Sequence, residues 1–253
     1  MSPKEFHRKI IHFTKEIKLP YTAKNFKEEI QEANIKNKNY DEFLYDLLEK
    51  EYDLRKDNGR KNRIRNAKFP YKKYIEDLIT EDLPEDGRNK LRILSTLEFV
   101  KTGQNIILAG NPGTGKTHMA IGLGIKACNE GYSVLFTTIP LLVNQLKESR
   151  SDKTLRAFEN RFEKYDLIIA DELGYISFDK EGSELLFTYL SLRAGRKSTI
   201  ITTNLSFERW DEIFKDPVMT AAMIDRLTHK SYIVNMNGNS YRLKETKQWL
   251  EKQ

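Results

Sequence analysis

The chain of 253 residues has a single cysteine and no long apolar run. Because Cys128 is alone, no disulfide can form within the chain, and we expect Cys128 to be buried as a small apolar side chain. No apolar run approaches the roughly 18 residues that a membrane-spanning helix needs. Residues 1–18 lack the continuous apolar core of a secretory signal. With 32% charged residues and a mean hydropathy of -0.63, the composition predicts a soluble, cytoplasmic protein.

Acidic residues are missing from one stretch near the N-terminus. None lies between Asp57 and Glu76, and this gap holds seven basic residues, namely Arg60, Lys61, Arg63, Arg65, Lys68, Lys72 and Lys73. Residues 1–70 carry 17 Lys/Arg against 12 Asp/Glu, so most of the net charge of +6 is N-terminal. Such a tract is either a solvated helix face or a surface for the phosphate backbone of nucleic acid. The second alternative predicts nucleic-acid contacts at the first five of these residues, from Arg60 to Lys68.

The same region contains the apolar spacing of an amphipathic helix. Apolar residues recur at i, i+3, i+4, i+7 and i+8, at Tyr40, Phe43, Leu44, Leu47 and Leu48. This face must pack within a small helical domain or on a partner. Asn39 and Glu42 resemble a capping box at the helix start, and Pro70 is expected to end the basic helical region. We predict a helical, basic domain at residues 1–70, and a linker and leading segment at 71–100.

In residues 101–253, apolar strands alternate with helical patterns. The strand candidates are 105–109, 133–137, 167–171, 199–203 and 232–236. Continuous apolar strands separated by helices are typical of a parallel sheet that is covered on both faces. We therefore predict an α/β fold with a five-stranded parallel sheet, preceded by the small helical N-terminal domain.

A glycine-rich loop follows the first predicted strand and opens a helical pattern. It matches G-x-x-x-x-G-K-[ST] at every fixed position, with Gly110, Asn111, Pro112, Gly113, Thr114, Gly115, Lys116 and Thr117. Its glycines allow backbone N–H groups to surround a polyphosphate, and the positive end of the next helix points at the same anion. In this pattern Lys116 reaches the β- and γ-phosphates of ATP, and the Thr117 hydroxyl binds Mg²⁺.

A second motif, L-I-I-A-D-E, ends the third predicted strand. Asp171 is expected beside Thr117, where it binds Mg²⁺ directly or through water. Glu172 is expected to orient and polarise the attacking water. The alternative is a strand that ends in two surface acids, and the complete phosphate loop upstream favours the catalytic interpretation.

Three further polar residues are candidates for the same chemistry. Asn204 follows the fourth strand and is either a sensor of the water near the γ-phosphate or a turn-forming residue. Arg226, on a helix before the last strand, either reaches a neighbouring subunit's γ-phosphate or pairs with Asp225 at the surface. Arg242 is a candidate second phosphate sensor. We assign no metal beyond Mg²⁺.

These motifs closely resemble those of the IstB-like ATPases, the transposition helpers of insertion sequences, which are related to DnaC helicase loaders and DnaA-type AAA+ proteins. The resemblance runs through N-I-I-L-A-G-N-P-G-T-G-K-T-H-M-A at 105–120, Y-D-L-I-I-A-D-E-L-G-Y at 165–175, D-R-L-T-H at 225–229 and S-Y-R-L at 240–243. Residues 43–70 resemble the N-terminal region of the transposition helpers rather than that of helicase loaders. Residues 193–198, R-A-G-R-K-S, depart from the R-Y-E-like segment of the family.

The resemblance implies an AAA+ core that hydrolyses ATP with Mg²⁺, forms homo-oligomers and binds duplex DNA without strong sequence preference. It also implies delivery of that DNA to a partner transposase. A replicative helicase loader has the same core, and neighbouring transposase or replication genes would distinguish the two. A small-molecule kinase is disfavoured, because the Asp171–Glu172 pair, Asn204 and Arg226 suit water activation and ATPase sites that are shared between subunits. A DNA-binding module that uses ATP only as a switch is a further alternative. The rate of ATP turnover, measured with and without DNA, would separate such a module from an active ATPase.

Overall fold

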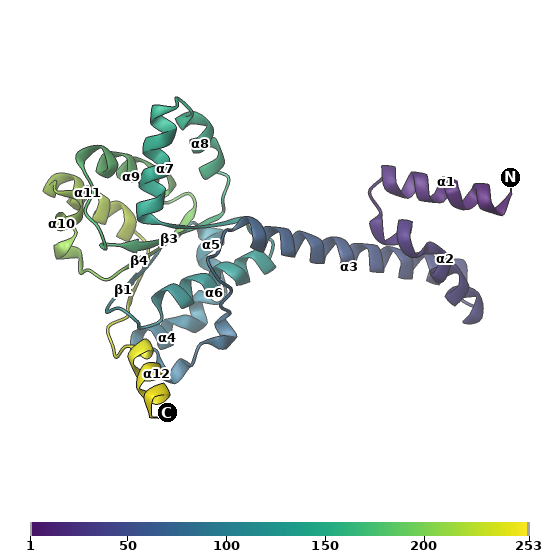
Figure 1. Cartoon of the computed structure of the whole chain (residues 1–253), viewed down its shortest axis with the longest axis horizontal. Helices are drawn as coiled ribbons and strands as arrows, with labels where there is room; N and C mark the ends of the chain where they lie inside the picture. The colour runs from purple at the N-terminus through teal and green to yellow at the C-terminus, as the bar shows by residue number, and fades with distance from the viewer. Residues whose placement is uncertain (1, 252–253) are drawn as a thin grey trace. The chain divides into compact units, whose positions relative to one another are not determined.

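The computed structural model describes residues 2–251 and divides the chain into two compact units, Met1–Asn62 and Arg63–Gln253. We call them the N-terminal and the C-terminal unit. Figure 1 shows helices alone in the first unit and a sheet covered by helices in the second. Within residues 2–251, no helix is both long enough and apolar enough to cross a bilayer.

The N-terminal unit consists of α1 (Pro3–Glu16), α2 (Pro20–Ile35) and the first part of α3 (Tyr40–Asn66). The predicted capping box of α3 is present, since Glu42 N donates to Asn39 Oδ1 at 2.8 Å and Asn39 N donates to Glu42 Oε2 at 3.1 Å. The buried carboxylate of Glu51 accepts hydrogen bonds from the backbone N and the hydroxyl of Thr22. A side chain of α3 therefore caps the start of α2.

The apolar face predicted for α3 packs only in part. Phe43 and Leu47 are half-buried, whereas Leu44 and Leu48 are each 53% exposed and Tyr40 is 92% exposed. Contacts between α2 and α3 include the Lys50–Glu29 and Glu51–Thr22 pairs. Spacing predicts which side chains share a helix face, but it does not say how much of that face a neighbour covers.

The C-terminal unit is built on a five-stranded, all-parallel sheet, as the sequence predicted. Its strands are β1 (Ile106–Ala109), β2 (Val134–Thr138), β3 (Leu167–Leu173), β4 (Ser198–Thr203) and β5 (Tyr232–Asn235). They lie in the order β2-β3-β4-β1-β5. Strand boundaries differ by one or two residues from those predicted, which is the usual uncertainty at element ends.

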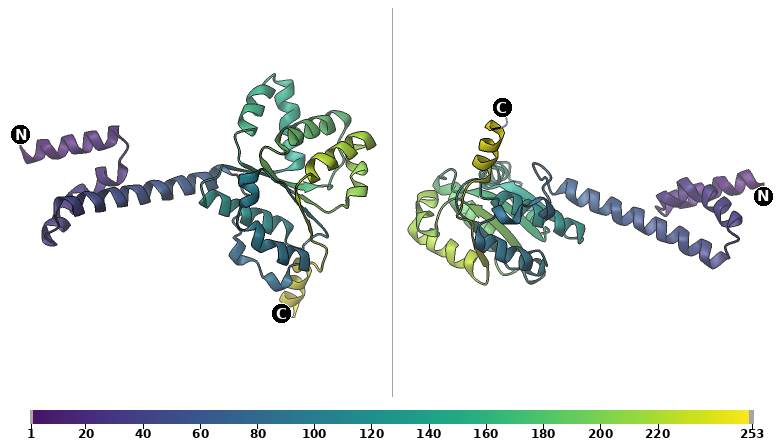
Figure 2. Two further views of the ribbon diagram at one scale, coloured as in Figure 1. Left: turned by 180° about the vertical axis from the view of Figure 1, so that it is seen from behind. Right: turned by 90° about the horizontal axis from the view of Figure 1, so that it is seen from below.

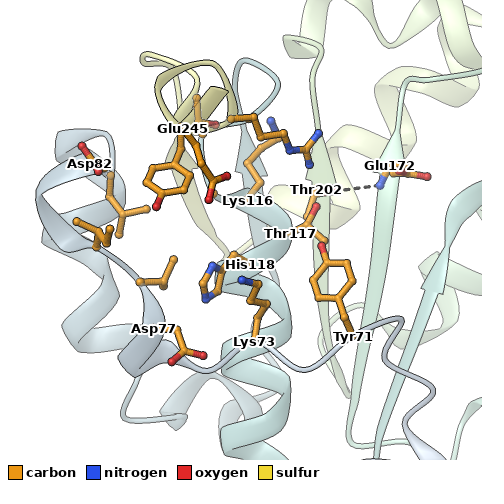
Figure 3. A pocket seen from close by; sticks show the side chains of 18 of the residues that line it. Tyr71, Lys73, Asp77, Asp82, Lys116, Thr117, His118, Glu172, Thr202 and Glu245 are labelled. Carbon is orange, nitrogen blue, oxygen red and sulfur yellow. Dashed lines mark hydrogen bonds between the residues drawn. The ribbon is translucent and has the colours of Figure 1, made fainter. Parts of the chain in front are cut away.

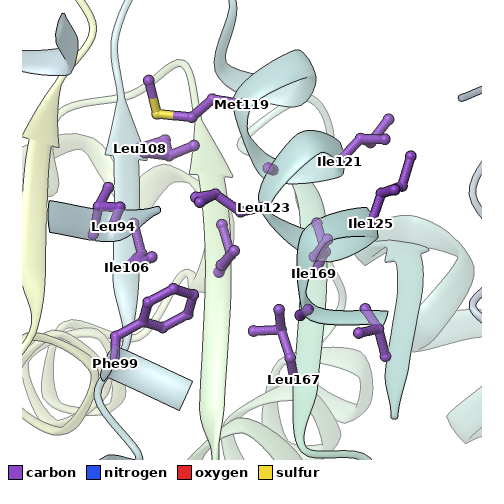
Figure 4. Close-up of a cluster of buried hydrophobic side chains, with 14 of the residues drawn as sticks. Leu94, Phe99, Ile106, Leu108, Met119, Ile121, Leu123, Ile125, Leu167 and Ile169 are labelled. Atoms are coloured by element: carbon purple, nitrogen blue, oxygen red, sulfur yellow. The ribbon is translucent and has the colours of Figure 1, made fainter. Parts of the chain in front are cut away.

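Helices cover both faces of the sheet, and the views in Figure 2 show this for the C-terminal unit. The side chains of Ile106 and Leu108 enter one core, while Ile107 enters the other, because successive side chains of a strand point to opposite faces. The first core, drawn in Figure 4, contains side chains of α4 (Glu85–Leu94), α5 (Glu98–Thr102) and α6 (Lys116–Asn129). The second contains α7 (Ile139–Ser151), α8 (Leu155–Phe162), α9 (Lys180–Arg193), α10 (Asp211–Phe214) and α11 (Pro217–Thr228). Cys128 is fully buried in the first core, as predicted, and burial raises the pKa of its thiol to about 12.

Both edges of the sheet have polar partners from outside it. Phe136 N of β2 donates to the carbonyl of Ala67 at 2.7 Å. At the other edge, Asn235 N of β5 donates to Asp86 Oδ2 at 2.7 Å, and Lys90 Nζ donates to the carbonyl of Ile233 at 2.6 Å. These contacts satisfy edge groups that could otherwise pair with another chain.

Candidate nucleotide-binding site

A pocket of about 400 Å³ lies at the carboxyl ends of the parallel strands, where open α/β sheets bind their ligands. Figure 3 shows the side chains that line it. They come from the phosphate loop, from the ends of β3 and β4, from residues 71–83, and from α12 (Tyr241–Leu250). The pocket therefore combines segments that are far apart in the sequence.

The phosphate loop has the conformation that its glycines allow. Gly113 and Gly115 have φ of 81° and 92°, which residues with a Cβ rarely adopt. A Cβ on Gly110 would lie 2.2 Å from the backbone carbon of Met236, so this glycine also permits a close approach of the chain after β5. Gly113 to Thr117 line the pocket, and Asn111 and Pro112 form the exposed outer turn of the loop.

Lys116 is a buried cation with neutral partners. Its Nζ donates to the carbonyl oxygens of Gly110 and Asn111, each at 2.6 Å, and within residues 2–251 no carboxylate forms an ion pair with it. Burial lowers the pKa of Lys116 to about 8; the nearby Asp171 charge opposes this change, and Arg242 adds to it. A buried ammonium group held only by neutral carbonyls fits an anionic ligand.

The Thr117 hydroxyl and the Asp171 carboxylate are in direct contact. Thr117 Oγ1 donates to the two carboxylate oxygens of Asp171 at 3.1 and 3.2 Å. Thr202 of β4 donates to Asp171 Oδ1 at 2.5 Å and accepts from the backbone N of Glu172 at 3.0 Å. Burial raises the pKa of Asp171 in spite of these hydrogen bonds and the charge of Lys116. Hydroxyl and carboxylate oxygens at one point are the ligands that Mg²⁺ prefers, so this pair fits the metal ion of a bound nucleotide.

Glu172 is held at the pocket by an irregular strand end. The pairing of β3 with β4 shifts in register between Ala170 and Leu173, and Glu172 has a φ of 68°. A non-glycine residue in this conformation costs about 1–3 kcal/mol and is typical of functional sites. Burial and the charge of Asp171 raise the pKa of Glu172, whereas Arg242 lowers it. The shift in register thus places Glu172 in the pocket lining, directly after Asp171 in the strand.

Helix α12 brings Arg242 to the same pocket. The N–H of Tyr241 donates to the carbonyl of Gly113 at 2.9 Å, and Ser240 Oγ caps the helix by accepting from Leu243 N. Lys244 forms an ion pair with Asp82 across the pocket rim. The helix is therefore attached to the phosphate loop at its first residue, and Arg242 lines the pocket.

Asn204 lies just outside the lining. It follows β4, and its Oδ1 is buried without a hydrogen-bond partner among residues 2–251. A Cβ on Gly174 would lie 2.8 Å from this oxygen, so Asn204 packs against the backbone that follows Glu172. Asn204 is therefore close to the segment that directly follows the strand end with the two carboxylates.

The structure does not bring Arg226 to the pocket. Arg226 lies on α11 with its guanidinium 4.8 Å from the centre of the Phe187 ring, within reach of a cation–π interaction. It lines a second recess, of about 390 Å³, together with Arg196. Residues 193–198, which depart from the family pattern, contain two arginines in different environments. Arg193 is buried and donates hydrogen bonds to the carbonyls of Phe162, Tyr165 and Ser198, whereas Arg196 lines the second recess.

The first five residues of the basic tract lie on α3 or just after it. Arg60, Lys61, Arg63 and Arg65 are on the helix, and Lys68 follows with a φ of 61°. Arg60 forms an ion pair with Asp57 at 3.4 Å, and Arg63 Nε donates to the carbonyl of Cys128 at 2.7 Å. Lys61, Arg65 and Lys68 are exposed.

Sequence reasoning missed several pocket residues, among them Tyr71, Lys73, Tyr175, Thr202 and Glu245. A signal existed for Thr202, because the hydroxyl of a threonine near the end of a buried strand needs a polar partner. No sequence motif marks Tyr71 and Lys73, because tertiary contacts bring them to the pocket.

The parallel sheet with a phosphate loop after β1 and an acidic pair at the end of β3 defines an AAA+ type P-loop fold. Solved structures with this fold include AMPPCP-bound DnaA from Aquifex aeolicus, with a TM-score of 0.56 and 21% identity over 73% of this chain and 56% of that chain. The DnaC helicase loader matches with a TM-score of 0.52 and 18% identity over 72% of this chain and 98% of that chain. At these identities the likeness shows the fold alone.

The sequence family is more specific. The family of IstB-like ATP binding proteins matches residues 13–249, and the chain belongs to this family. A protein named as an ATP-binding protein of insertion sequence IS5376, from Geobacillus stearothermophilus, is 36% identical over 97% of this chain and 98% of its own length. Another, named for insertion sequence IS21 of Pseudomonas aeruginosa, is 35% identical over 90% of this chain and 86% of its own length.

Proposed function

We propose that this protein is a Mg²⁺-dependent ATPase that binds duplex DNA largely without sequence preference and recruits or activates a transposase. The observation that carries the ATPase part is the contact of Thr117 with Asp171 beside the buried Lys116. Family membership, with relatives named for insertion sequences, supports the part in transposition. We infer that the protein acts in the cytoplasm, where its DNA substrate is found.

In this proposal the chain's own groups bind and orient the nucleotide. Lys116 exchanges its two carbonyl partners for the β- and γ-phosphate oxygens, and the loop N–H groups bind the same phosphates. Thr117 and Asp171 hold Mg²⁺, which neutralises charge on the terminal phosphates. Thr202 fixes the orientation of Asp171 and, through the Glu172 N–H, the strand end that carries the base.

Glu172 is the proposed general base, with Asn204 positioning the water beside it. The carboxylate accepts a proton as the water attacks, and the raised pKa of Glu172 makes it a stronger base than an ordinary glutamate. Arg242 supplies positive charge from α12 to the phosphates. Arg226 is proposed to act on the nucleotide of a neighbouring copy, so the active form is a homo-oligomer.

Replacing the loop lysine tests nucleotide binding directly. We expect Lys116→Ala to weaken ATP binding by about 10- to 100-fold, because a charge-assisted hydrogen bond contributes about 1.5–3 kcal/mol. Isothermal titration with ATP and Mg²⁺ measures this. Lys126→Ala, on the same helix but away from the pocket, is the matched control. Wild-type affinity in Lys116→Ala protein would show that the loop does not hold the phosphates.

Removal of basic charge tests the DNA-binding part. We expect Arg60→Gln, Lys61→Gln and Lys68→Gln together to weaken binding to all duplexes alike, since phosphate contacts carry no sequence information. The salt slope of binding should fall by about 0.9 for each phosphate that the variant no longer neutralises. This set leaves Arg63 in place, because Arg63 also bonds the core carbonyl of Cys128. Fluorescence anisotropy at several salt concentrations gives both quantities.

A control variant that loses the same number of positive charges separates the effect of lost phosphate contacts from the effect of lower net charge. Lys4→Gln, Arg8→Gln and Lys9→Gln remove three positive charges from exposed positions of α1 and should leave the salt slope unchanged. Equal slopes in all three proteins would mean that the tract is solvated or docks a protein. The DNA site would then have to be sought on the AAA+ core.

A helicase loader with the same core is the competing function, and the DnaC likeness extends to the fold alone. Co-purification distinguishes the two. With ATP and duplex DNA present, the proposed function expects a transposase to be retained by the tagged protein. Retention of the replicative helicase in its place would favour the loader.

A further inference from the structure

Residues 67–75, at the start of the C-terminal unit, pack along α6, the helix that begins in the phosphate loop. We call these residues the strap. Ala67 is fully buried and its carbonyl accepts from Phe136 N of β2. At the other end, the Tyr74 carbonyl lies 2.9 Å from Nε2 of His118, two residues into α6. The strap is therefore tied to the core at both ends.

Two glycines inside α6 make room for the strap. A Cβ on Gly124 would lie 2.9 Å from Cε1 of Phe69, and a Cβ on Gly122 would lie 3.0 Å from the backbone N of Ile75. Each glycine in a helix interior costs about 0.5–1 kcal/mol relative to alanine. The two glycines lower the stability of α6 at the positions where the strap comes closest to it. The sequence of α6 is therefore adapted to the path of the strap.

Between these anchors, the strap delivers Tyr71 and Lys73 to the pocket. In Figure 3 the Tyr71 ring lies below Thr117 with its hydroxyl directed toward it. Tyr71 lies near enough to Asp171, Glu172 and Arg242 for their charges to act on its pKa, which partial burial raises. Within residues 2–251 its hydroxyl has no hydrogen-bond partner, and the side chain is 47% exposed.

These positions define what Tyr71 can contact. The Thr117–Asp171 pair marks the end of the pocket where the terminal phosphate and its metal ion belong. A neutral phenol can donate to a phosphate oxygen there without adding negative charge beside two carboxylates. A purely structural tyrosine, by contrast, would pack its ring or bond a protein group with its hydroxyl.

We propose that Tyr71 is a nucleotide-contacting residue whose hydroxyl donates a hydrogen bond to the terminal phosphoryl group of the triphosphate. The inference rests on the proposed function, since it uses the same pocket and the same nucleotide. It adds a sensor of the triphosphate that comes from outside the AAA+ motifs. ADP lacks the group that Tyr71 contacts, so the strap distinguishes ATP from ADP.

The test compares two nucleotides in the full-length protein. Tyr71→Phe removes one oxygen and keeps the ring. We expect its affinity for a non-hydrolysable ATP analogue with Mg²⁺ to fall by about tenfold or more, as for loss of a hydrogen bond to a charged group, while ADP affinity stays unchanged. Tyr74→Phe is the matched control, because Tyr74 is on the same strap, is 41% exposed and lies outside the pocket lining. It should change neither affinity.

The outcomes separate this inference from the proposed function. Equal affinities of wild-type and Tyr71→Phe protein for the analogue, or an equal loss for both nucleotides, would overturn the terminal-phosphate contact. Thermal unfolding of the variant checks that the fold is intact. A wild-type protein that binds the analogue without hydrolysing ATP would refute the ATPase function, and the comparison of affinities would still decide the role of Tyr71.

Discussion

Glu172→Gln protein is expected to bind ATP normally and to hydrolyse it at least about 100-fold more slowly than wild type, the usual contribution of a positioned general base. Glutamine keeps the size and the hydrogen bond to water but cannot accept its proton. The substitution should leave the site in place, because the bulge positions residue 172 through its backbone N–H to Thr202. Initial rates of phosphate release and equilibrium ATP binding measure the two parts of this expectation.

The acid side of the pH profile gives an independent check. Burial and Asp171 raise the pKa of Glu172, so wild-type turnover should begin to fall at a higher pH than an ordinary glutamate would give. Glu130→Gln is the control, since it removes an exposed carboxylate outside the pocket lining and should retain turnover. If Glu172→Gln protein hydrolysed ATP at the wild-type rate, Glu172 would not be the group that activates water.

The parts of the site that the sequence predicted are those carried by contiguous motifs. The phosphate loop, the strand before it and the acidic pair at the end of β3 each combine their signal within a few residues. Thr117 and Asp171 could be expected to meet, because Thr117 follows β1 and Asp171 lies near the carboxyl end of β3 in the same parallel sheet. The structure brings their oxygens to 3.1 Å. The parallel sheet was likewise predictable, because apolar strands alternate with helical segments.

The remaining parts depend on contacts between segments distant in sequence. Thr202 reaches Asp171 because β4 lies beside β3, and the sequence does not state strand order. Tyr71 reaches the pocket because two glycines admit the strap to α6, and no local pattern marks that approach. Tyr40 belongs to the predicted apolar helix face but is exposed, because helical spacing predicts which residues share a face and not whether that face is buried. Packing of distant segments decides each of these features.

Arg226→Ala protein is expected to bind ATP with wild-type affinity and to lose turnover by about 10³-fold or more, the range for a transition-state arginine. The reason is positional. Arg226 lies outside the pocket of its own chain, in a recess with Arg196, and stacks on Phe187. A guanidinium in that recess lies outside its own chain's nucleotide pocket, so in the proposed function its target is a nucleotide bound to another copy. Arg209→Ala removes an exposed arginine that pairs with Glu212 outside the recess, and should leave turnover unchanged.

Mixing two inactive proteins tests whether the contact is between copies. Lys116→Ala protein has an intact Arg226 but a defective pocket, and Arg226→Ala protein has the reverse. In mixed assemblies, an intact pocket of one variant can face the intact arginine of the other, so turnover should recover in part and peak at intermediate mixing ratios. Mixed assembly is verified by pull-down with a tag on one variant. If verified mixtures stay inactive at every ratio, Arg226 acts within its own chain, and its stacking on Phe187 is structural.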